Sequence, residues 1–237
     1  MDTSESSAIL LNEVIPLGRN GKDYLHMFNL FGMHDGKSYI DCASGPSSFN
    51  VYMTARRKKV VSVDPLYHKD RQEIEEKINS SFDSLIEQVA RKQHLFKWEM
   101  YRSVEHLSEL RREAMNQFIN DFEAGRSEGR YVAGSLPDLE FKDHQFDIAL
   151  CSHFLFLYSA HFSIEFHKKA ILEMMRVAKE CRIYPLYDLS GNPSPYLREI
   201  VKWLKNEGFH TQIFNVPYEF QKGANQCLII RKTVNSI

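Results

Sequence analysis

The sequence of 237 residues contains few cysteines, no excess of either charge, and no hydrophobic run long enough to cross a bilayer. Its four cysteines, Cys42, Cys151, Cys181 and Cys227, stand far apart, and no two have the short spacing of zinc ligands. We therefore expect buried free thiols in a reducing compartment, the cytoplasm, and no metal site.

The charge balance and the N-terminus limit the classes of partner. The formal net charge is -1 at pH 7, so no field of one sign is available to attract nucleic acid or an acidic membrane surface. The first residues, MDTSESSAILLNEV, lack the basic start and long apolar core of a signal peptide. The sequence thus predicts a protein without a nucleic-acid or membrane partner, and it leaves the oligomeric state open.

What the chain does contain is an alternation of short apolar runs and amphipathic helical patterns. This predicts an α/β fold: a Rossmann-like, seven-stranded, mostly parallel sheet with helices on both faces. The last two strands are too close for a crossover, so they should form a terminal antiparallel hairpin. Helices are expected at 21–32, 46–59, 162–180 and 194–209, and strands at 38–43, 59–65, 130–135, 146 onward, 181–190, 210–220 and 225–232.

A long polar stretch follows the second expected strand. Within it, apolar residues recur at helical spacing, for example Ile74, Ile78 and Phe82. The stretch is longer than an ordinary crossover, so we expect one domain over residues 1–237 with a helical insert at about 68–130. That insert would be either a lid or an interface.

The loop after the first strand, DCASGPSS, has one glycine and lacks the GxGxxG pattern of dinucleotide-binding loops. Its small residues still let a ligand approach the backbone, and Pro46 suits the first position of a helix. Asp41 precedes the loop; an acid there disfavours a pyrophosphate and favours a ligand that carries an ammonium or sulfonium group.

Ligands of open parallel sheets bind beyond the carboxyl ends of the strands, so the later loops matter too. Asp64 follows the second strand and could bind both hydroxyls of a ribose, or could simply cap the turn before Pro65. Ser135 and Leu136 follow the third strand and are placed to contact a flat base. His153 after the fourth strand is either a core or a catalytic residue, and most aromatic residues after it are expected in the core.

The order of these features over nearly the whole chain carries a resemblance. The blocks are PLGRNGKDYLHMF, DCASGPSSFN, VVSVDPLY, LCSHFLFLYS and VPYEFQKGANQ. Together they resemble the class I S-adenosylmethionine-dependent methyltransferases and, within them, a little-characterised bacterial group. The chain departs from the family pattern at Ala43 and Ser47, where glycine is frequent, and at Gly134-Ser135, where an acid is usual.

The resemblance implies S-adenosyl-L-methionine as the cofactor and a set of residues around it. The amino-acid end of the cofactor would be held by Asp41, Ala43, Ser44 and Gly45. The ribose and adenine would meet Asp64, Pro65, Leu66, Ser135 and Leu136. The reactive sulfonium and methionine part would lie near Ser152, His153, Arg19 and Tyr24.

The implied reaction is in-line methyl transfer to a small-molecule acceptor, in which positioning supplies much of the catalysis. A base is needed only if the acceptor must lose a proton, and the candidates are His153, Tyr158 and His161. Two alternative functions remain open on the sequence alone. One is a nicotinamide-dependent oxidoreductase, and the other is a non-catalytic S-adenosylmethionine-binding protein that keeps the fold.

Overall fold

The computed structural model describes residues 15–32 and 36–233, and within them the chain forms one seven-stranded sheet. Its order is β3-β2-β1-β4-β5-β7-β6, with β7 antiparallel to both neighbours and the other pairs parallel. This confirms the predicted fold class, including the terminal hairpin. The strands are β1 (Ser38–Cys42), β2 (Lys59–Asp64), β3 (Tyr131–Ala133), β4 (Phe146–Ser152), β5 (Ala178–Tyr184), β6 (Phe209–Asn215) and β7 (Gln226–Lys232).

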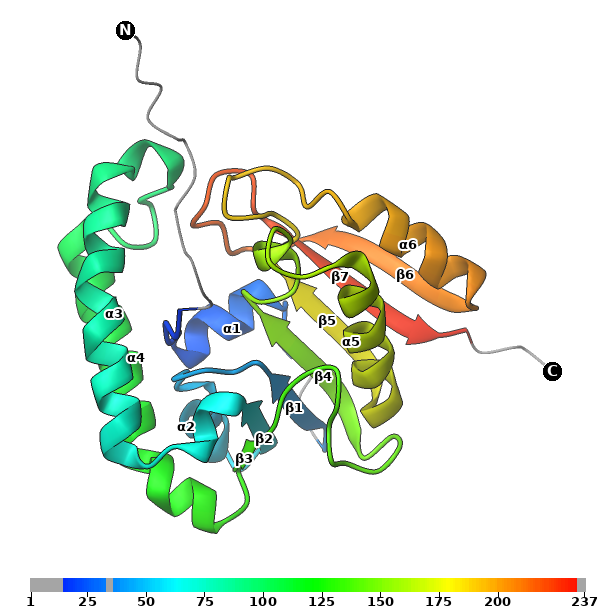
Figure 1. Cartoon of the computed structure of the whole chain (residues 1–237), viewed down its shortest axis with the longest axis horizontal. Coiled ribbons are helices and arrows are strands. Elements are labelled where there is room, and N and C mark those ends of the chain that lie inside the picture. Colours follow the sequence, from blue (N-terminus) through cyan, green and yellow to red (C-terminus); the bar gives the residue numbers. More distant parts are fainter. Residues whose placement is uncertain (1–14, 33–35, 234–237) are drawn as a thin grey trace, which may run out of the picture.

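Helices cover both faces of the sheet (Figure 1). On one face lie α1 (Gly21–Met27) and α2 (Phe49–Thr54), and on the other α5 (Ile164–Val177) and α6 (Leu197–Asn206). Neighbouring residues of β1 point to opposite faces, so Tyr39 packs in the core under α1 and α2 while Ile40 packs in the core under α5 and α6.

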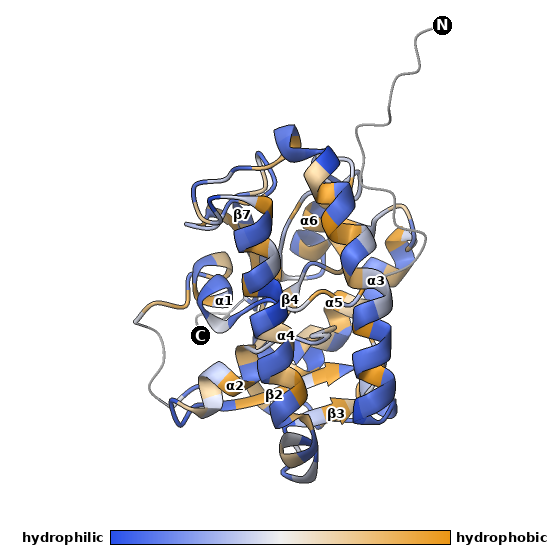
Figure 2. Cartoon of the chain, turned by 90° about the vertical axis from the view of Figure 1, so that its left-hand side faces the viewer, coloured by the Kyte–Doolittle hydropathy of each residue, from blue (hydrophilic) through white to orange (hydrophobic). Residues whose placement is uncertain are grey.

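Two long helices, α3 (Arg71–Arg91) and α4 (Val104–Ser127), pack against each other between β2 and β3 in the chain (Figure 1). Asp70 and Glu73 form a reciprocal capping box that begins α3. Phe82 of α3 is buried with Phe118 and Phe122 of α4. The sides of the pair seen in Figure 2 are mainly hydrophilic, as expected for helices with one apolar face.

Several boundaries differ from the expectation. Pro46 is not the first residue of a helix, because the loop after β1 turns with positive φ at Ala43 (54°) and Gly45 (55°) and α2 begins only at Phe49. Arg57 (φ 57°) lies beyond the end of α2, so the predicted helix to residue 59 is too long. β5 begins within the predicted helix 162–180 and ends before Pro185, which has no N–H to donate to a ladder.

The cysteines are free and buried, as expected. Among residues 15–32 and 36–233, no helix is both long and apolar enough to cross a membrane. The N-terminal stretch 1–14, on which the expectation about a signal peptide rests, lies outside the described residues.

Candidate functional site

A cavity of about 490 Å³, called the large cavity here, lies at the carboxyl ends of the strands, where the strand order reverses between β1 and β4. It brings together residues from four loops and the N-terminal segment. The predicted site residues that line it are Arg19, Tyr24, Ala43, Ser44, Gly45, Asp64, Pro65, Leu66, Ser135, Leu136, Ser152 and His153.

The loop after β1 is held by its neighbours. The Ser44 N–H donates to the Val63 carbonyl (3.2 Å), and the Tyr67 hydroxyl donates to the Gly45 carbonyl (2.6 Å). A side chain added at Gly45 would meet no atom within 4 Å, so the backbone borders open space. The loop is therefore a fixed cradle that a ligand can approach closely.

Asp64 caps the turn at Pro65, one of the two roles expected for it, and it also borders the large cavity. Its Oδ1 accepts from the Leu66 N–H (2.8 Å), which makes it the cap of the turn at Pro65–His68. Its Oδ2 accepts from the Gly45 N–H (2.9 Å), and the carboxyl also lines the large cavity. Burial raises the pKa of Asp64, while the two backbone hydrogen bonds oppose this.

Asp41 lies beneath the cradle, fully buried, and does not line the large cavity. The Ser44 hydroxyl donates to its Oδ2 (2.6 Å), and its Oδ1 is buried without a hydrogen-bond partner among the described residues. Burial raises the pKa of Asp41 to about 7, against the opposing hydrogen bond from Ser44. The direct ligand contact that the sequence suggested for Asp41 is therefore not supported by its position.

Arg19 lies in the wall of the large cavity without a carboxylate partner among the described residues. Its Nη1 donates to the Leu17 carbonyl (3.2 Å), and its Nε is buried without a hydrogen-bond partner. Burial, and next the positive charge of Arg111, lowers the pKa of the guanidinium. A half-buried cation with a buried, unpartnered Nε is stabilised when a ligand supplies a negative charge.

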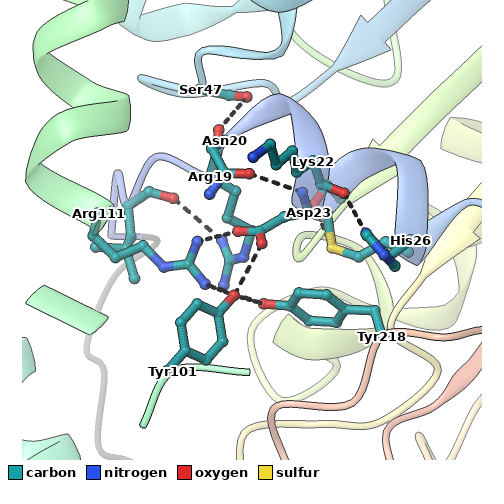
Figure 3. Close-up of polar contacts among 12 residues, drawn as sticks. Arg19, Asn20, Lys22, Asp23, His26, Ser47, Tyr101, Arg111 and Tyr218 are labelled. Carbon is teal, nitrogen blue, oxygen red and sulfur yellow. Dashed lines mark hydrogen bonds and ion pairs between the residues drawn. The ribbon is translucent and has the colours of Figure 1, made fainter. Parts of the chain in front are cut away.

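A second arginine lies beside it in a buried polar network, defined as Asp23, Tyr101, Arg111 and Tyr218 (Figure 3). The Arg111 guanidinium pairs with Asp23 and donates to the hydroxyls of Tyr101 (2.8 Å) and Tyr218 (3.0 Å). These residues come from α1, the segment before α4, α4 itself, and the segment before β7. Nothing in the sequence pattern links positions so far apart, and our sequence reading did not find this network.

A smaller cavity of about 110 Å³, called the small cavity here, adjoins the large one. Arg19 and His153 line both cavities. Its other walls come from α3, α4, and the segments that follow β4, β5 and β6. Tyr158, one of the predicted base candidates, lines the small cavity, and its hydroxyl accepts from the Ile15 N–H (3.1 Å).

His153 sits where the two cavities meet. Its Nδ1 lies 2.9 Å from the Ser152 hydroxyl, and its ring stands edge-on to Tyr184. Burial lowers the pKa of His153 well below its usual range, with a further contribution from Arg19, so the imidazole is neutral at pH 7. A neutral imidazole can accept a proton. His161, in contrast, is exposed and lines neither cavity.

Three phenylalanines form one wall of the large cavity, and of these Phe154 was expected in the core; Phe156 does lie in the core, as expected. Phe154, Phe162 and Phe166 line it, and the rings of Phe162 and Phe166 stack at 4.5 Å. The helical spacing of the last two could have indicated a shared face, but not that this face borders a cavity. No group of three or more metal-ligating side chains lies together in the described part of the chain.

No family model matches this sequence. Among solved structures, the chain resembles a TehB-like SAM-dependent methyltransferase from Corynebacterium glutamicum (13% identity, TM-score 0.48, 94% of this chain and 90% of that one). It also resembles the magnesium protoporphyrin IX methyltransferase of Synechocystis, solved with bound SAM (14% identity, TM-score 0.41, 84% of this chain and 71% of that one).

A curated relative is much closer in sequence. The "Uncharacterized protein MJ0045" of Methanocaldococcus jannaschii is 34% identical over 223 residues, which cover 94% of this chain and 98% of the relative. It comes from an archaeon, so it does not confirm the bacterial group that we expected. The chain belongs to the same protein family as MJ0045.

Proposed function

We propose that this protein is a cytoplasmic S-adenosylmethionine-dependent methyltransferase that acts on a small-molecule acceptor by in-line methyl transfer. One observation carries the proposal: the small-residue cradle, Asp64 and the unpaired Arg19 all border a single cavity at the switch point of the sheet. Its volume of about 490 Å³ lies within the ~300–1,000 Å³ common for ligand sites.

The residues of the large cavity fit the parts of this cofactor. An ionised carboxylate offers about four acceptor positions, and Asp64 uses two of them on backbone N–H groups, which leaves acceptor positions for ribose hydroxyls. Arg19 matches a carboxylate at the methionine end, and Tyr24 also lines the large cavity. The flat apolar surfaces of Leu66 and Leu136 suit adenine.

When bound, the cofactor supplies a methyl group on a sulfonium, and the S–C electron pair stays on sulfur as the acceptor forms its bond to carbon. The chain positions the acceptor in line and excludes water. His153 would take the proton of an acceptor that carries one, because its neutral ring lies where the cavities meet. Tyr158 is the next candidate, and His161 is the least suitable because it borders neither cavity.

We also propose that residues 1–237 act as one domain and that α3 and α4 form a lid. Ile86 and Val89 of α3 and Leu107 of α4 line the small cavity, and Lys77 of α3 lines the large one. Closing or opening this pair would therefore change access to both cavities at once.

The test is calorimetric titration of the wild type, Asp64→Ala and Asp70→Ala with S-adenosylmethionine and S-adenosylhomocysteine. The wild type should bind both ligands, and Asp64→Ala should bind at least about ten-fold more weakly, because a hydrogen-bond acceptor for the ribose is lost. Asp70 is the matched control, since its carboxylate also caps a turn of helix but lines neither cavity.

Each outcome has a distinct meaning. A wild type that binds neither ligand would overturn the methyltransferase proposal. If Asp64→Ala and Asp70→Ala bind the two ligands with equal affinity, only the assignment of Asp64 to the ribose is wrong. Binding without methylation of any thiol, amine, hydroxyl or carboxylate acceptor in a panel would leave the non-catalytic binding protein as the better account.

A further inference from the structure

The small cavity has the size of one ring. Its volume is about 110 Å³, and an apolar cavity of ~150 Å³ in another protein holds benzene. Most of its walls are apolar, with Leu85 from α3, Leu107 from α4, Leu189 after β5 and Phe220 before β7. Such walls favour a compact ligand with an aromatic or aliphatic body.

The charges around the small cavity have one sign. Its charged lining residues are Arg19 and Arg111, and no aspartate or glutamate is among the described residues that line it. Asp23 balances the charge of Arg111, whereas the described residues supply no ion pair for Arg19. The neutral His153 adds no charge. The cavity therefore favours an anion over a neutral ligand and disfavours a cation.

Arg19 also has donors to spare. A guanidinium carries five N–H groups, and among the described residues this one makes a single hydrogen bond, from Nη1 to Leu17. Because its side chain lines both cavities, it can bind a carboxylate in the small cavity in addition to one in the large cavity.

From this geometry we infer that the small cavity is the acceptor site and that it takes a small carboxylic acid with an apolar body of about one ring. The inference rests on the proposed function, because the acceptor is placed beside the methionine end of the large cavity. The acid group would face Arg19, and the apolar body would lie among the leucine and phenylalanine side chains.

The test uses three probes of one ring that differ in charge: benzoate, benzyl alcohol and benzylamine. Each is titrated calorimetrically into the full-length protein at pH 7, with and without saturating S-adenosylhomocysteine. Benzoate should bind at least about ten-fold more tightly than benzyl alcohol, and benzylamine should bind most weakly, because only benzoate gains a charge-assisted hydrogen bond.

A variant that fills the small cavity tests whether benzoate binds there. Leu189→Trp adds volume at a half-buried loop position of the small cavity and should weaken benzoate binding at least about ten-fold while S-adenosylhomocysteine affinity is kept. Leu172→Trp is the control, since Leu172 is exposed on α5 and lines neither cavity. Ile86→Trp fills the cavity from α3 instead and is used if Leu189→Trp is not folded.

The outcomes separate this inference from the proposed function. Benzoate binding no tighter than benzyl alcohol, or unchanged in both filling variants, would overturn the inference even if S-adenosylhomocysteine binds. If S-adenosylhomocysteine does not bind, the methyltransferase proposal fails, and the titrations without it still decide whether the small cavity selects acids.

Discussion

Two arginines lie next to each other in this protein, Arg19 half-buried and Arg111 fully buried, and their surroundings differ. Arg111 belongs to the buried polar network, where it pairs with Asp23 and donates to two tyrosine hydroxyls. Arg19 has no ion pair among the described residues, and its Nε is buried without a hydrogen-bond partner. Figure 3 shows both guanidinium groups beside Asp23, which pairs with Arg111 alone.

The difference separates a structural role from a ligand-binding role. In the network, the donors and acceptors satisfy one another and join α1, α4 and the segment before β7, so the network needs no ligand. Arg19 borders both cavities, and its buried Nε donor costs free energy until a hydrogen-bond acceptor meets it. On the proposed function, the same residue type thus contributes to stability at one position and to ligand binding at the other.

The largest effect should come from breaking the network. Arg111→Met leaves the Asp23 carboxylate buried without its partner, so we expect the free energy of unfolding to fall by about 3–5 kcal/mol. Denaturant unfolding of both proteins measures this. Arg112→Met is the control on the same helix, because Arg112 pairs with Asp83 at the surface and its loss should cost no more than about 1 kcal/mol. Similar losses in the two variants would show that the network is not a special source of stability.

The next effect concerns Arg19. Arg19→Met removes a cation that has no protein partner, so the free energy of unfolding should stay within about 1 kcal/mol of the wild type or rise. Affinity for S-adenosylhomocysteine should fall by a factor of about 10–100, because a charged hydrogen bond to the ligand contributes about 1.5–3 kcal/mol. Unfolding and calorimetry on the same preparation give both values.

Arg19→Lys separates the effect of charge from that of hydrogen-bond geometry, since it keeps the positive charge and removes the planar guanidinium with its paired N–H donors. We expect an affinity between those of the wild type and Arg19→Met. If Arg19→Met instead loses as much stability as Arg111→Met and binds normally, both arginines are structural, and the contrast between them is wrong.

How far the sequence predicts this structure depends on the range of the interactions. Helical spacing located Ile74, Ile78 and Phe82 on the buried face of α3, because period and burial are local properties of one helix. The loop residues after the strands also lie together as expected, because parallel strands bring their carboxyl ends to one edge. The predicted start of the second helix at Pro46 was wrong, since α2 begins at Phe49. The loop before it contains a positive φ at Ala43, and the sequence does not indicate this because the residue is not a glycine.

The small cavity and the network could not be predicted in this way. Asp23, Arg111 and Tyr218 meet only because α4 and the segment before β7 fold over α1, and no pattern within a short window reports that. Asp41 shows the same limit. Its position in the sequence suggested direct ligand contact, whereas the structure places it beneath the cradle.

The smallest effect is a pH dependence that tests this indirect role of Asp41. Its pKa is about 7 in the ligand-free protein, and the positive charges of a bound S-adenosylmethionine would lower it. Binding then favours the ionised form, so affinity should be full above pH 7 and should weaken about ten-fold between pH 8 and pH 6. Calorimetry at several pH values measures this slope.

The same pKa has the opposite consequence for the free protein. The folded-state pKa of Asp41 is raised from 3.8 to about 7, so the stability that its protonated form contributes is present at low pH and is lost as the pH rises toward 7. Asp41→Asn is neutral at every pH and should bind with a flatter pH profile. It should also lack the stability loss that the wild type shows as the pH rises from about 4 to about 7. If the binding profile of Asp41→Asn stays as steep as that of the wild type, Asp41 is not the titrating group and its indirect role is wrong.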